Sequence, residues 1–336
     1  MGFFRVTFKK HSHLFEVLEC LVQVLGDKGL ARLDFNPTTG MTIVSPSPKQ
    51  ISIIRIVMGV ECFSSYDVTG GEMVTRHIES VDDEHEIIET TELEPADDIS
   101  IWICPKKLKG FISSLENLED VTMYHNLKKN PDVMNLSGYS SSQSAIQKMV
   151  ELEFKLSETP TGMDGMGFKG KTIKIDGKLT APRDEAIKLI KDLMNLELDT
   201  FDITLDKVVT QKEKGGGGVS SSLFEISSGQ RILNESKNCS MNVSFSSSEN
   251  NDGDDNVNGG KCRVFLSKTW EKRKKPYSFP VSCLRESLKA VEASESTVFV
   301  VEKPCEALDG DSYMTMVNTS KNSGAQIFHI IAPVFT

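Results

Sequence analysis

Apolar residues alternate with polar ones at the start of the chain and then change to a helical period. Phe4, Val6 and Phe8 occupy every second position, which predicts a strand with one buried face. Apolar residues at helical spacing follow over residues 14–25, and Gly26 predicts the end of that helix. Runs rich in isoleucine and valine then predict strands at Leu30–Phe35, Met41–Val44 and Ile51–Val60. The pattern is a strand, an amphipathic helix and several more strands.

The second half of the chain repeats this plan. Ile173, Ile175 and Leu179 alternate, and a helix is predicted to begin at Pro182. Two further helices are predicted at about Pro105–Leu118 and Val281–Ala293, and strands at Val121–His125, Met149–Leu156, Val298–Val301, Tyr313–Val317 and Ile327–Ile331. Six positions of like character recur at one constant offset: Ile103/Phe279, Leu108/Leu284, Lys109/Arg285, Ile112/Leu288, Leu115/Val291 and Glu116/Glu292. Self-similarity at a fixed offset predicts internal duplication.

Two polar segments interrupt the repeat. Glu79–Asp98 is strongly acidic, and we expect a solvated loop there. Ser246–Gly260 is a low-complexity polar run, so we expect a partly disordered insert over residues 240–260. The predicted fold class is α+β with two copies of one domain, at residues 1–156 and 172–336, joined by a connector at 157–171.

Composition narrows the class of protein. The chain has 336 residues, 38 Lys and Arg, and 48 Asp and Glu, which gives a formal net charge of −10. Such a charge argues against nucleic-acid binding through overall positive charge, but it allows a locally basic face. The seven cysteines are scattered without a C-x-x-C pair, which indicates reduced thiols inside a cell. Since no apolar run approaches the length of a membrane span, we expect no membrane association.

Catalytic motifs are scarce. Gly165–Thr172 matches the phosphate-binding pattern G-x-x-x-x-G-K-[ST], but the residues after it alternate like a strand instead of starting a helix. Nucleotide binding is therefore the least favoured alternative. The six histidines show no convincing metal-ligand spacing, and no G-x-S-x-G motif is present. We expect no catalytic activity, no metal and no cofactor.

The segments Val17–Leu21 (VLECL), Ile187–Leu193 (IKLIKDL) and Ile331–Pro333 (IAP) resemble segments of the DNA sliding clamps of the proliferating cell nuclear antigen family. Val17–Leu21 is similar to the first-helix V-L-E-A-L of that family, Ile187–Leu193 to its A-R-I-C-R-D-L, and Ile331–Pro333 to the L-A-P near its C-terminus. The resemblance implies helices that line the inner face of a ring around duplex DNA and antiparallel sheets on the outer face. It also implies a processivity factor that tethers DNA polymerase and other clamp-binding proteins.

The same resemblance implies an assembly and a compartment. A homo-oligomer is expected, with a trimer favoured and a dimer possible, in the nucleus or at a site of viral DNA replication. One subunit of a heteromeric DNA-damage checkpoint ring is the alternative.

Lysines and arginine on three predicted helices fall where the family faces DNA, and helix spacing places the pairs on shared faces. With two residues ahead of the first helix, the expected DNA-binding residues are Lys9, Lys10, Lys106, Lys107, Lys109, Lys188, Lys191, Arg285 and Lys289. The first helix departs from the family, with Phe15, Glu16 and Val22 where lysines are expected. The basic run Lys272–Lys275 fits a loop that reaches DNA, a nuclear-import patch or a solvated loop.

Two further surfaces follow from the resemblance. A pocket for partner peptides is expected at Val44, Met163, Met166, Phe168, Ile331 and Pro333. A subunit interface is expected where one strand edge, with Met149, Leu152 and Phe154, meets another, with Met241, Val243 and Phe245.

Overall fold

The computed structural model describes most of the chain in two compact units. The described residues are 2–69, 74–81, 87–94, 99–113, 120–126, 129–140, 148–158, 174–196, 198–210, 219–228, 241–248, 262–267, 269–273, 275–303 and 312–334. Unit 1 comprises Met1–Ser45 and Ile56–Met166, and unit 2 comprises Pro46–Arg55 and Gly167–Thr336. A short stretch of the first half of the sequence thus belongs to unit 2.

Unit 1 is built from strands and two α-helices. Its elements in chain order are β1 (Phe3–Phe8), α1 (His11–Leu25), β2 (Ala31–Asn36), β3 (Gly40–Pro46), β4 (Ser52–Met58), a 3-10 turn (Val60–Cys62), β5 (Phe63–Thr69), β6 (Val74–Val81), β7 (Ile87–Glu94), β8 (Ile99–Ile103), α2 (Pro105–Ser113), β9 (Val121–Asn126), β10 (Val133–Ser140) and β11 (Lys148–Lys155). The first residues of β4, 52–55, belong to unit 2.

Unit 2 has the same order of elements. They are β12 (Ile175–Pro182), α3 (Arg183–Asn195), β13 (Thr200–Thr210), β14 (Val219–Ser228), β15 (Asn242–Ser248), β16 (Arg263–Leu266), β17 (Tyr277–Pro280), α4 (Ser282–Glu292), β18 (Ser294–Glu302), β19 (Met314–Ser320) and β20 (Gln326–Ile331). Without β6 and β7, each unit reads strand, helix, five strands, helix, three strands.

The sheet orders match strand by strand. Unit 1 has the order β11-β10-β9-β1-β5, and unit 2 has β20-β19-β18-β12-β16. The second set of strands runs β8-β2-β3-β4 in the first half of the sequence and β17-β13-β14-β15 in the second. Because the element order and both strand orders agree, the structure shows a duplicated α+β module built on antiparallel pairs. The predicted fold class is confirmed.

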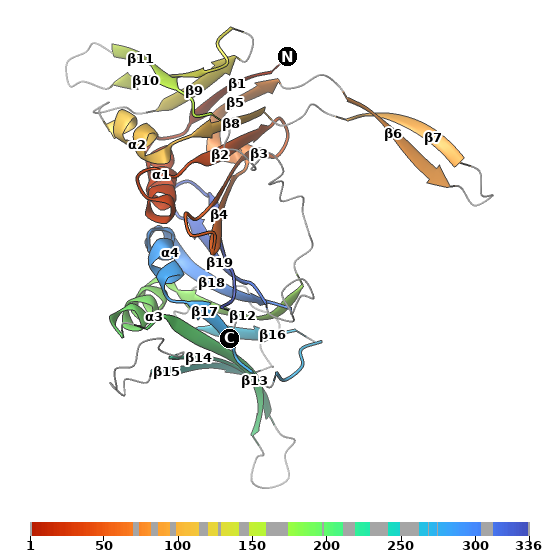
Figure 1. Ribbon diagram of the computed structural model, residues 1–336, viewed down its shortest axis with the longest axis vertical. Coiled ribbons are helices and arrows are strands. Elements are labelled where there is room, and N and C mark those ends of the chain that lie inside the picture. The colour runs from red at the N-terminus through yellow and green to blue at the C-terminus, as the bar shows by residue number, and fades with distance from the viewer. Residues whose placement is uncertain are drawn as a thin grey trace. The chain divides into compact units, whose positions relative to one another are not determined.

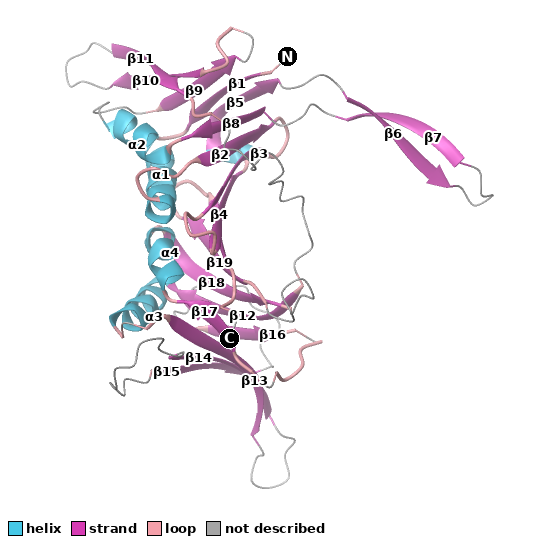
Figure 2. Ribbon diagram, in the orientation of Figure 1, coloured by secondary structure: helices cyan, strands magenta, loops and turns pink. Residues whose placement is uncertain are grey.

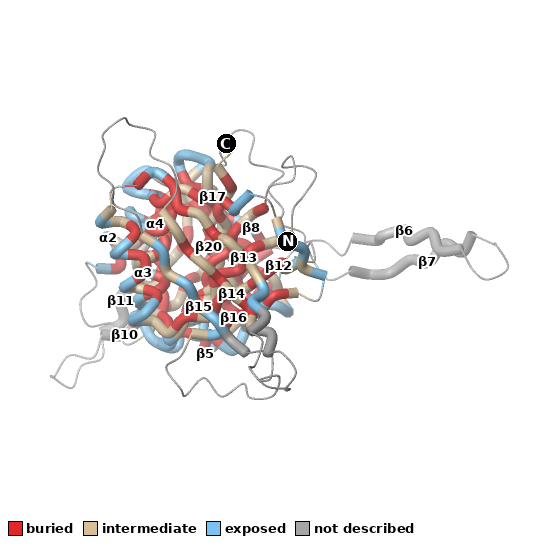
Figure 3. Tube along the Cα trace, turned by 90° about the horizontal axis from the view of Figure 1, so that it is seen from below, coloured by how far each residue is buried: buried red, intermediate tan, exposed pale blue. Residues whose placement is uncertain are grey.

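The predicted alternation forms the cores of the units. Phe4, Val6 and Phe8 are fully buried in unit 1, and Leu14, Val17, Leu18 and Leu21 form the buried face of α1. Gly26 ends that helix with φ of 67°, a backbone conformation that glycine adopts without steric cost. Figure 2 shows α1 beside α2, and α3 beside α4, each pair on the sheets of its own unit. Buried positions alternate with less buried ones along β13 and β14 (Figure 3).

The acidic segment differs from its prediction. Instead of a loop throughout, residues 74–81 and 87–94 form the antiparallel ribbon β6–β7 (Figure 1). Unit 2 has no counterpart of this ribbon in its described element order. Isoleucine and valine favour strands, and they occur within this acidic run. The predicted loop rested on the charges alone. The polar insert expected at 240–260 lies mostly outside the described residues, although Asn242–Ser248 forms β15.

Candidate functional site

Two of the predicted DNA-facing lysines of unit 1, Lys106 and Lys109 of α2, contact carboxylates. Lys109 of α2 donates a hydrogen bond of 2.9 Å from Nζ to Oε1 of Glu19 in α1, and its ammonium lies 4.8 Å from the ring centroid of Phe15. Lys106 Nζ lies 3.4 Å from Oδ1 of Asp27, just beyond α1. Lys107 is exposed. Glu19 and Asp27 had no recognisable role in the sequence, because they are far from α2 along the chain.

In unit 2 the predicted residues divide between two helices. Lys188 and Lys191 are exposed on α3, opposite a face buried through Leu189, Ile190 and Leu193. Arg285 and Lys289 are exposed on α4, where Lys289 Nζ contacts Glu292 Oε2 at 3.0 Å. α3 also contains two aspartates and one glutamate, which offset its arginine and two lysines.

The helix surfaces therefore carry cations without strong net positive charge. α1 has no lysine or arginine at all, as its sequence indicated, and exposed Lys9 and Lys10 stand just ahead of it. Phosphate attraction grows with the number of cations that are free to displace counterions, so ion pairs with nearby carboxylates weaken it. This arrangement suits loose contact with a phosphate backbone better than tight binding.

Among the described strands, β15 lies at the end of its sheet and has a neighbour, β14, on one side. Ser228 N donates to Met241 O at 2.9 Å, and the register with β14 continues without a bulge. Because bonded and non-bonded pairs alternate along an antiparallel ladder, Val243 and Phe245 direct their backbone groups at β14. Ser244, and every second residue on either side of it in β15, directs its backbone N–H and C=O away from β14. The Val243 and Phe245 side chains are half-buried on the core of unit 2.

Strand β11 likewise ends its sheet among the described strands. Leu156 N donates to Asp132 O at 2.8 Å, and an unbroken register joins β10 to β11. The same alternation directs the backbone of Glu153 and Lys155 away from β10. Phe154 is 6% exposed and packs edge-on against Phe111, with ring centroids 5.8 Å apart. The side chains of Met149 and Leu152 lie outside the described part of the chain.

In unit 2, the edge that corresponds to the edge of β11 is paired with another strand. Its strand β20, the counterpart of β11, is neighboured by β4, the counterpart of β15. The residues that precede and begin β4 belong to unit 2, and Ala332 N donates to Ile51 O at 2.9 Å. Ser52 Oγ donates to Glu286 Oε2 of α4 at 3.0 Å. Unit 2 thus contains one completed pairing at the edge equivalent to that of β11, which has no such neighbour among the described strands.

The C-terminal segment is held by unit 2 on two sides. Besides the bond from Ala332, Val334 N donates to Ser278 O of β17 at 2.9 Å. Ile331 is fully buried and Pro333 is buried beside it. Val44, in unit 1, is 5% exposed. Met163, Met166 and Phe168 lie outside the described residues, so the peptide pocket remains a prediction.

Burial shifts the pKa of several groups in the described part of the chain, including His13, His125 and Cys283. Burial lowers the pKa of His13 and of His125, whose Nδ1 lies 2.9 Å from Val133 O. Burial, and to a lesser extent Glu286, raises the pKa of the Cys283 thiol to about 12. Among the described residues no cluster of metal-ligating side chains occurs. No helix in the described segments is long and apolar enough to cross a membrane. The G-x-x-x-x-G-K-T motif at 165–172 falls outside them.

Comparison with known proteins identifies the fold. No protein-family model and no curated protein matches the sequence. Among solved structures, the proliferating cellular nuclear antigen of Entamoeba histolytica aligns over 99% of this chain and 99% of its own, with a TM-score of 0.62 and 13% sequence identity. The chain therefore has the fold of this sliding clamp, and the likeness expected from the short sequence segments is confirmed at the level of the fold.

Proposed function

We propose that this protein is a DNA sliding clamp, a ring that encircles duplex DNA and tethers DNA polymerase and other DNA enzymes. The observation that carries the proposal is the duplicated module in which β11 and β15 each end a sheet among the described strands. A chain with such edges assembles head to tail, and a head-to-tail contact closes into a ring when the rotation per subunit allows it. The likeness of the fold to that of a sliding clamp supports the closure of this head-to-tail contact into a ring.

The edge pairing supports self-assembly in particular. Within unit 2, β20 already accepts the start of β4, and β11 and β15 are the duplicated counterparts of these two strands. Pairing β11 of one copy with β15 of the next satisfies two open rows of backbone groups at once. We favour a homotrimer, with a dimer as the smaller alternative. This interface would contain the strands of Met149–Phe154 and Met241–Phe245.

The helix charges support weak, sequence-independent contact with DNA. Exposed lysines on α2 and α3 offer phosphate contacts that carry no sequence information. Carboxylates such as Glu19 limit their strength. A closed ring holds DNA by enclosure, so low affinity is compatible with retention and favours movement along the duplex. The proposed role is that of a scaffold without catalysis, in the nucleus or where viral DNA replicates.

A retention assay tests the proposal. Duplex DNA attached to a bead at one end is incubated with the protein at low salt, and the free end is then blocked or left open. A ring that encloses DNA remains after a high-salt wash only when the end is blocked, and it is released when the duplex is cut. If the protein is retained equally on DNA with a blocked end and on DNA with an open end, it does not enclose the duplex.

Light scattering on the purified protein separates the two assembly hypotheses. A stable trimer or dimer supports the homo-oligomeric clamp. A monomer that also fails the retention assay favours the alternative, in which the chain is one subunit of a heteromeric DNA-damage checkpoint ring. Charge reversal of Lys188 and Lys191 together should lower loading onto DNA without changing the mass of the assembly.

A further inference from the structure

Two histidines are buried in unit 1, and each has a ring nitrogen without a hydrogen-bond partner among the described residues. His125 of β9 is 1% exposed and leaves Nε2 unpaired, and His13 of α1 is 5% exposed and leaves Nδ1 unpaired. The other buried titratable side chains described in unit 1 are Asp34 and the thiols of Cys20, Cys62 and Cys104. Of these side chains, histidine is the one that gains a proton between pH 8 and pH 5.

His125 joins β9 to the start of β10 through its side chain. The carbonyl oxygen of Val133 lies 2.9 Å from Nδ1, and because a carbonyl only accepts, Nδ1 carries the proton. Val133 precedes the backbone ladder between these strands, which covers Asn135–Ser137 of β10. The hydrogen bond from His125 to Val133, the His125 clasp, thus joins the two strands beyond the end of their ladder. In this neutral ring Nε2 has no proton to donate.

The imidazole packs in an aromatic cluster. Its centroid lies 5.7 Å from that of Phe4 in β1, and Phe4 stacks on Phe35 of β2 at 3.8 Å. The charged neighbours of these two residues along their strands are Arg5, which is exposed, and Asp34, which pairs with Arg32. Successive side chains of a strand point to opposite faces of the sheet, so both charges lie away from the imidazole.

Protonation of the buried ring is therefore unfavourable. Burial lowers the pKa of His125, and the bond to Val133 offsets this only in part. Asp132, just ahead of β10, is exposed. When the clasp is open, the ring is in water and takes up a proton near its ordinary pKa of 6.5. The open state then binds more protons than the closed state, so its population rises as pH falls.

His13 has a different set of neighbours. Burial has the largest effect and lowers its pKa, Glu16 raises it, and Lys10 and Lys9 lower it. A carboxylate of the same helix can therefore balance a proton on His13, whereas His125 is surrounded by aromatic rings. His13 thus serves as a control for the clasp.

The outer strands of unit 1 are attached through a short ladder. β10 pairs with β11 at eight positions but with β9 at three. The counterpart ladder of unit 2, between β19 and β18, has six pairs. Val301 of β18 stands at the repeat offset from His125 and is fully buried, so this position in unit 2 has no titratable side chain. A change at His125 therefore acts where few backbone bonds attach β10 and β11 to the sheet.

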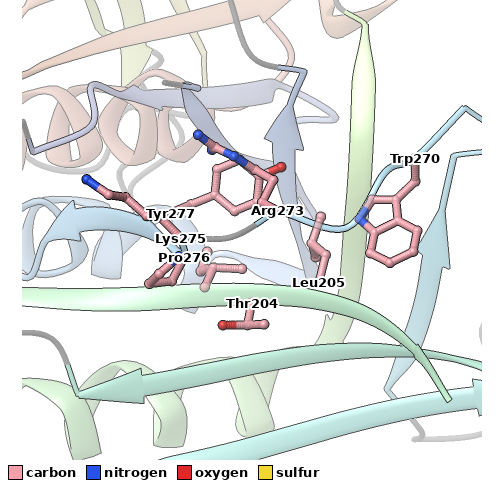
Figure 4. A pocket seen from close by; sticks show the side chains of 8 residues that line it. Thr204, Leu205, Trp270, Arg273, Lys275, Pro276 and Tyr277 are labelled. Carbon is pink, nitrogen blue, oxygen red and sulfur yellow. The ribbon is translucent and has the colours of Figure 1, made fainter. Parts of the chain in front are cut away.

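Two buried titratable groups of unit 2 lie at acceptors. His329 Nε2 lies 3.6 Å from Oε2 of Glu286. Tyr277, which lies beside Arg273 in Figure 4, donates its hydroxyl to Asp176. A proton added to His329 would meet a carboxylate, in contrast to a proton added to His125. Unit 2 is therefore an internal reference for the response to acid.

We propose that the His125 clasp is an acid-sensitive switch, in which protonation of Nε2 frees the edge formed by β10 and β11 from β9. The neutral ring keeps this edge attached at pH 7 and above, and the edge opens in a growing fraction of molecules below about pH 6. In the proposed clamp β11 is one side of the subunit joint, so mild acid would weaken the ring there. This consequence for the ring rests on the proposed function.

Hydrogen exchange of the intact protein at pH 7, 6 and 5 tests the switch. Mass spectrometry follows peptides from β10–β11 and from β19–β20, and the rates are corrected for the effect of pH on intrinsic exchange. Protection of β10–β11 should fall by up to about tenfold per pH unit below about 6.5, as expected for one proton taken up on opening. Protection of β19–β20 should remain constant. A fall of equal size in both regions, or in neither, overturns the proposal.

The variant His125→Asn separates the proton from the hydrogen bond. The asparagine amide can donate to Val133 but cannot take up a proton, so protection of β10–β11 should no longer depend on pH. His13→Asn removes the other buried histidine and should leave this dependence unchanged. The proposal fails if His125→Asn retains the dependence or if His13→Asn removes it. If His125→Asn does not fold, the comparison of the two regions in the unsubstituted protein still decides.

Light scattering at the same pH values tests the consequence for the ring. An assembly joined through β11 should dissociate more at pH 5 than at pH 7, and less so in His125→Asn. A protein that is monomeric at every pH but shows the pH-dependent exchange contradicts the homo-oligomeric ring and supports the switch. Equal dissociation with and without His125 contradicts a role of the clasp in the ring.

Discussion

Lys109 of α2 points its ammonium at the Glu19 carboxylate of α1, with 2.9 Å between Nζ and Oε1. Lys109, which was predicted from the sequence to contact DNA, is thus paired with Glu19 of the neighbouring helix. About a quarter of the lysine side chain and a third of the glutamate side chain are exposed, so solvent screens the pair. In the proposed clamp, this ion pair would compete with phosphate for Lys109.

Replacing Glu19 by Gln should therefore strengthen binding to duplex DNA. We expect about a two- to threefold gain at low salt that disappears at high salt, because a screened surface pair is worth less than about 1 kcal/mol. Fluorescence anisotropy with a labelled duplex measures it. Glu16→Gln removes one negative charge from the same helix and serves as the control. Equal gains in both variants would show that net charge, and not the release of Lys109, is responsible.

Proline at Ser244 should dissociate the assembly. Ser244 directs its N–H at the open edge of β15, so proline removes a donor needed by a neighbouring strand but none used by β14. We expect the subunit affinity to fall by at least about tenfold, measured by light scattering at several protein concentrations. Ser244→Ala retains the N–H and should assemble normally. An unchanged mass for the proline variant would exclude this edge as the interface.

Phenylalanine at Tyr277 should destabilise the fold. The Tyr277 hydroxyl donates to Asp176, a residue that is 4% exposed, and the change leaves that carboxylate without this donor. Loss of a partner from a buried acceptor costs about 1–3 kcal/mol, which denaturant titration detects. Asp206 contacts Lys272, and because its side chain is 26% exposed, Asp206→Asn serves as a control with a smaller cost. An equal loss in both variants would argue against a special role for the buried bond.

The same tyrosine predicts a dependence on pH. Burial, together with the bond to Asp176, raises the pKa of Tyr277 in the folded protein above its ordinary value. The unfolded chain therefore loses this proton near pH 10, while the folded chain retains it. The unfolded state binds fewer protons in that range, so the free energy of unfolding decreases as pH rises above about 10. Tyr277→Phe should show a shallower decrease, and parallel curves would contradict the assignment.

Sequence reasoning succeeded where a pattern repeats locally. The period of residues 14–25 predicted α1, and like positions in the helices around Leu108 and Leu284 predicted the duplication that the strand orders confirm. It failed where charge concealed strand-forming residues, as in β6 and β7. Contacts between distant segments, such as Lys109 with Glu19 or the start of β4 with β20, leave no periodic signal. The described structure was needed to find them.

Thiol chemistry provides a last test, which addresses the packing of α4. Cys283 is fully buried, and its pKa is raised to about 12 because burial and the nearby Glu286 disfavour the thiolate. Since the thiolate is the reactive form, Cys283 should resist iodoacetamide at pH 8 in the folded protein and react once denaturant is added. Cys262 is only partly buried and should be alkylated before Cys283. Peptide mapping by mass spectrometry follows both residues in one sample. If Cys283 reacts as fast as Cys262 under native conditions, α4 opens readily to solvent, which would contradict the full burial of Cys283.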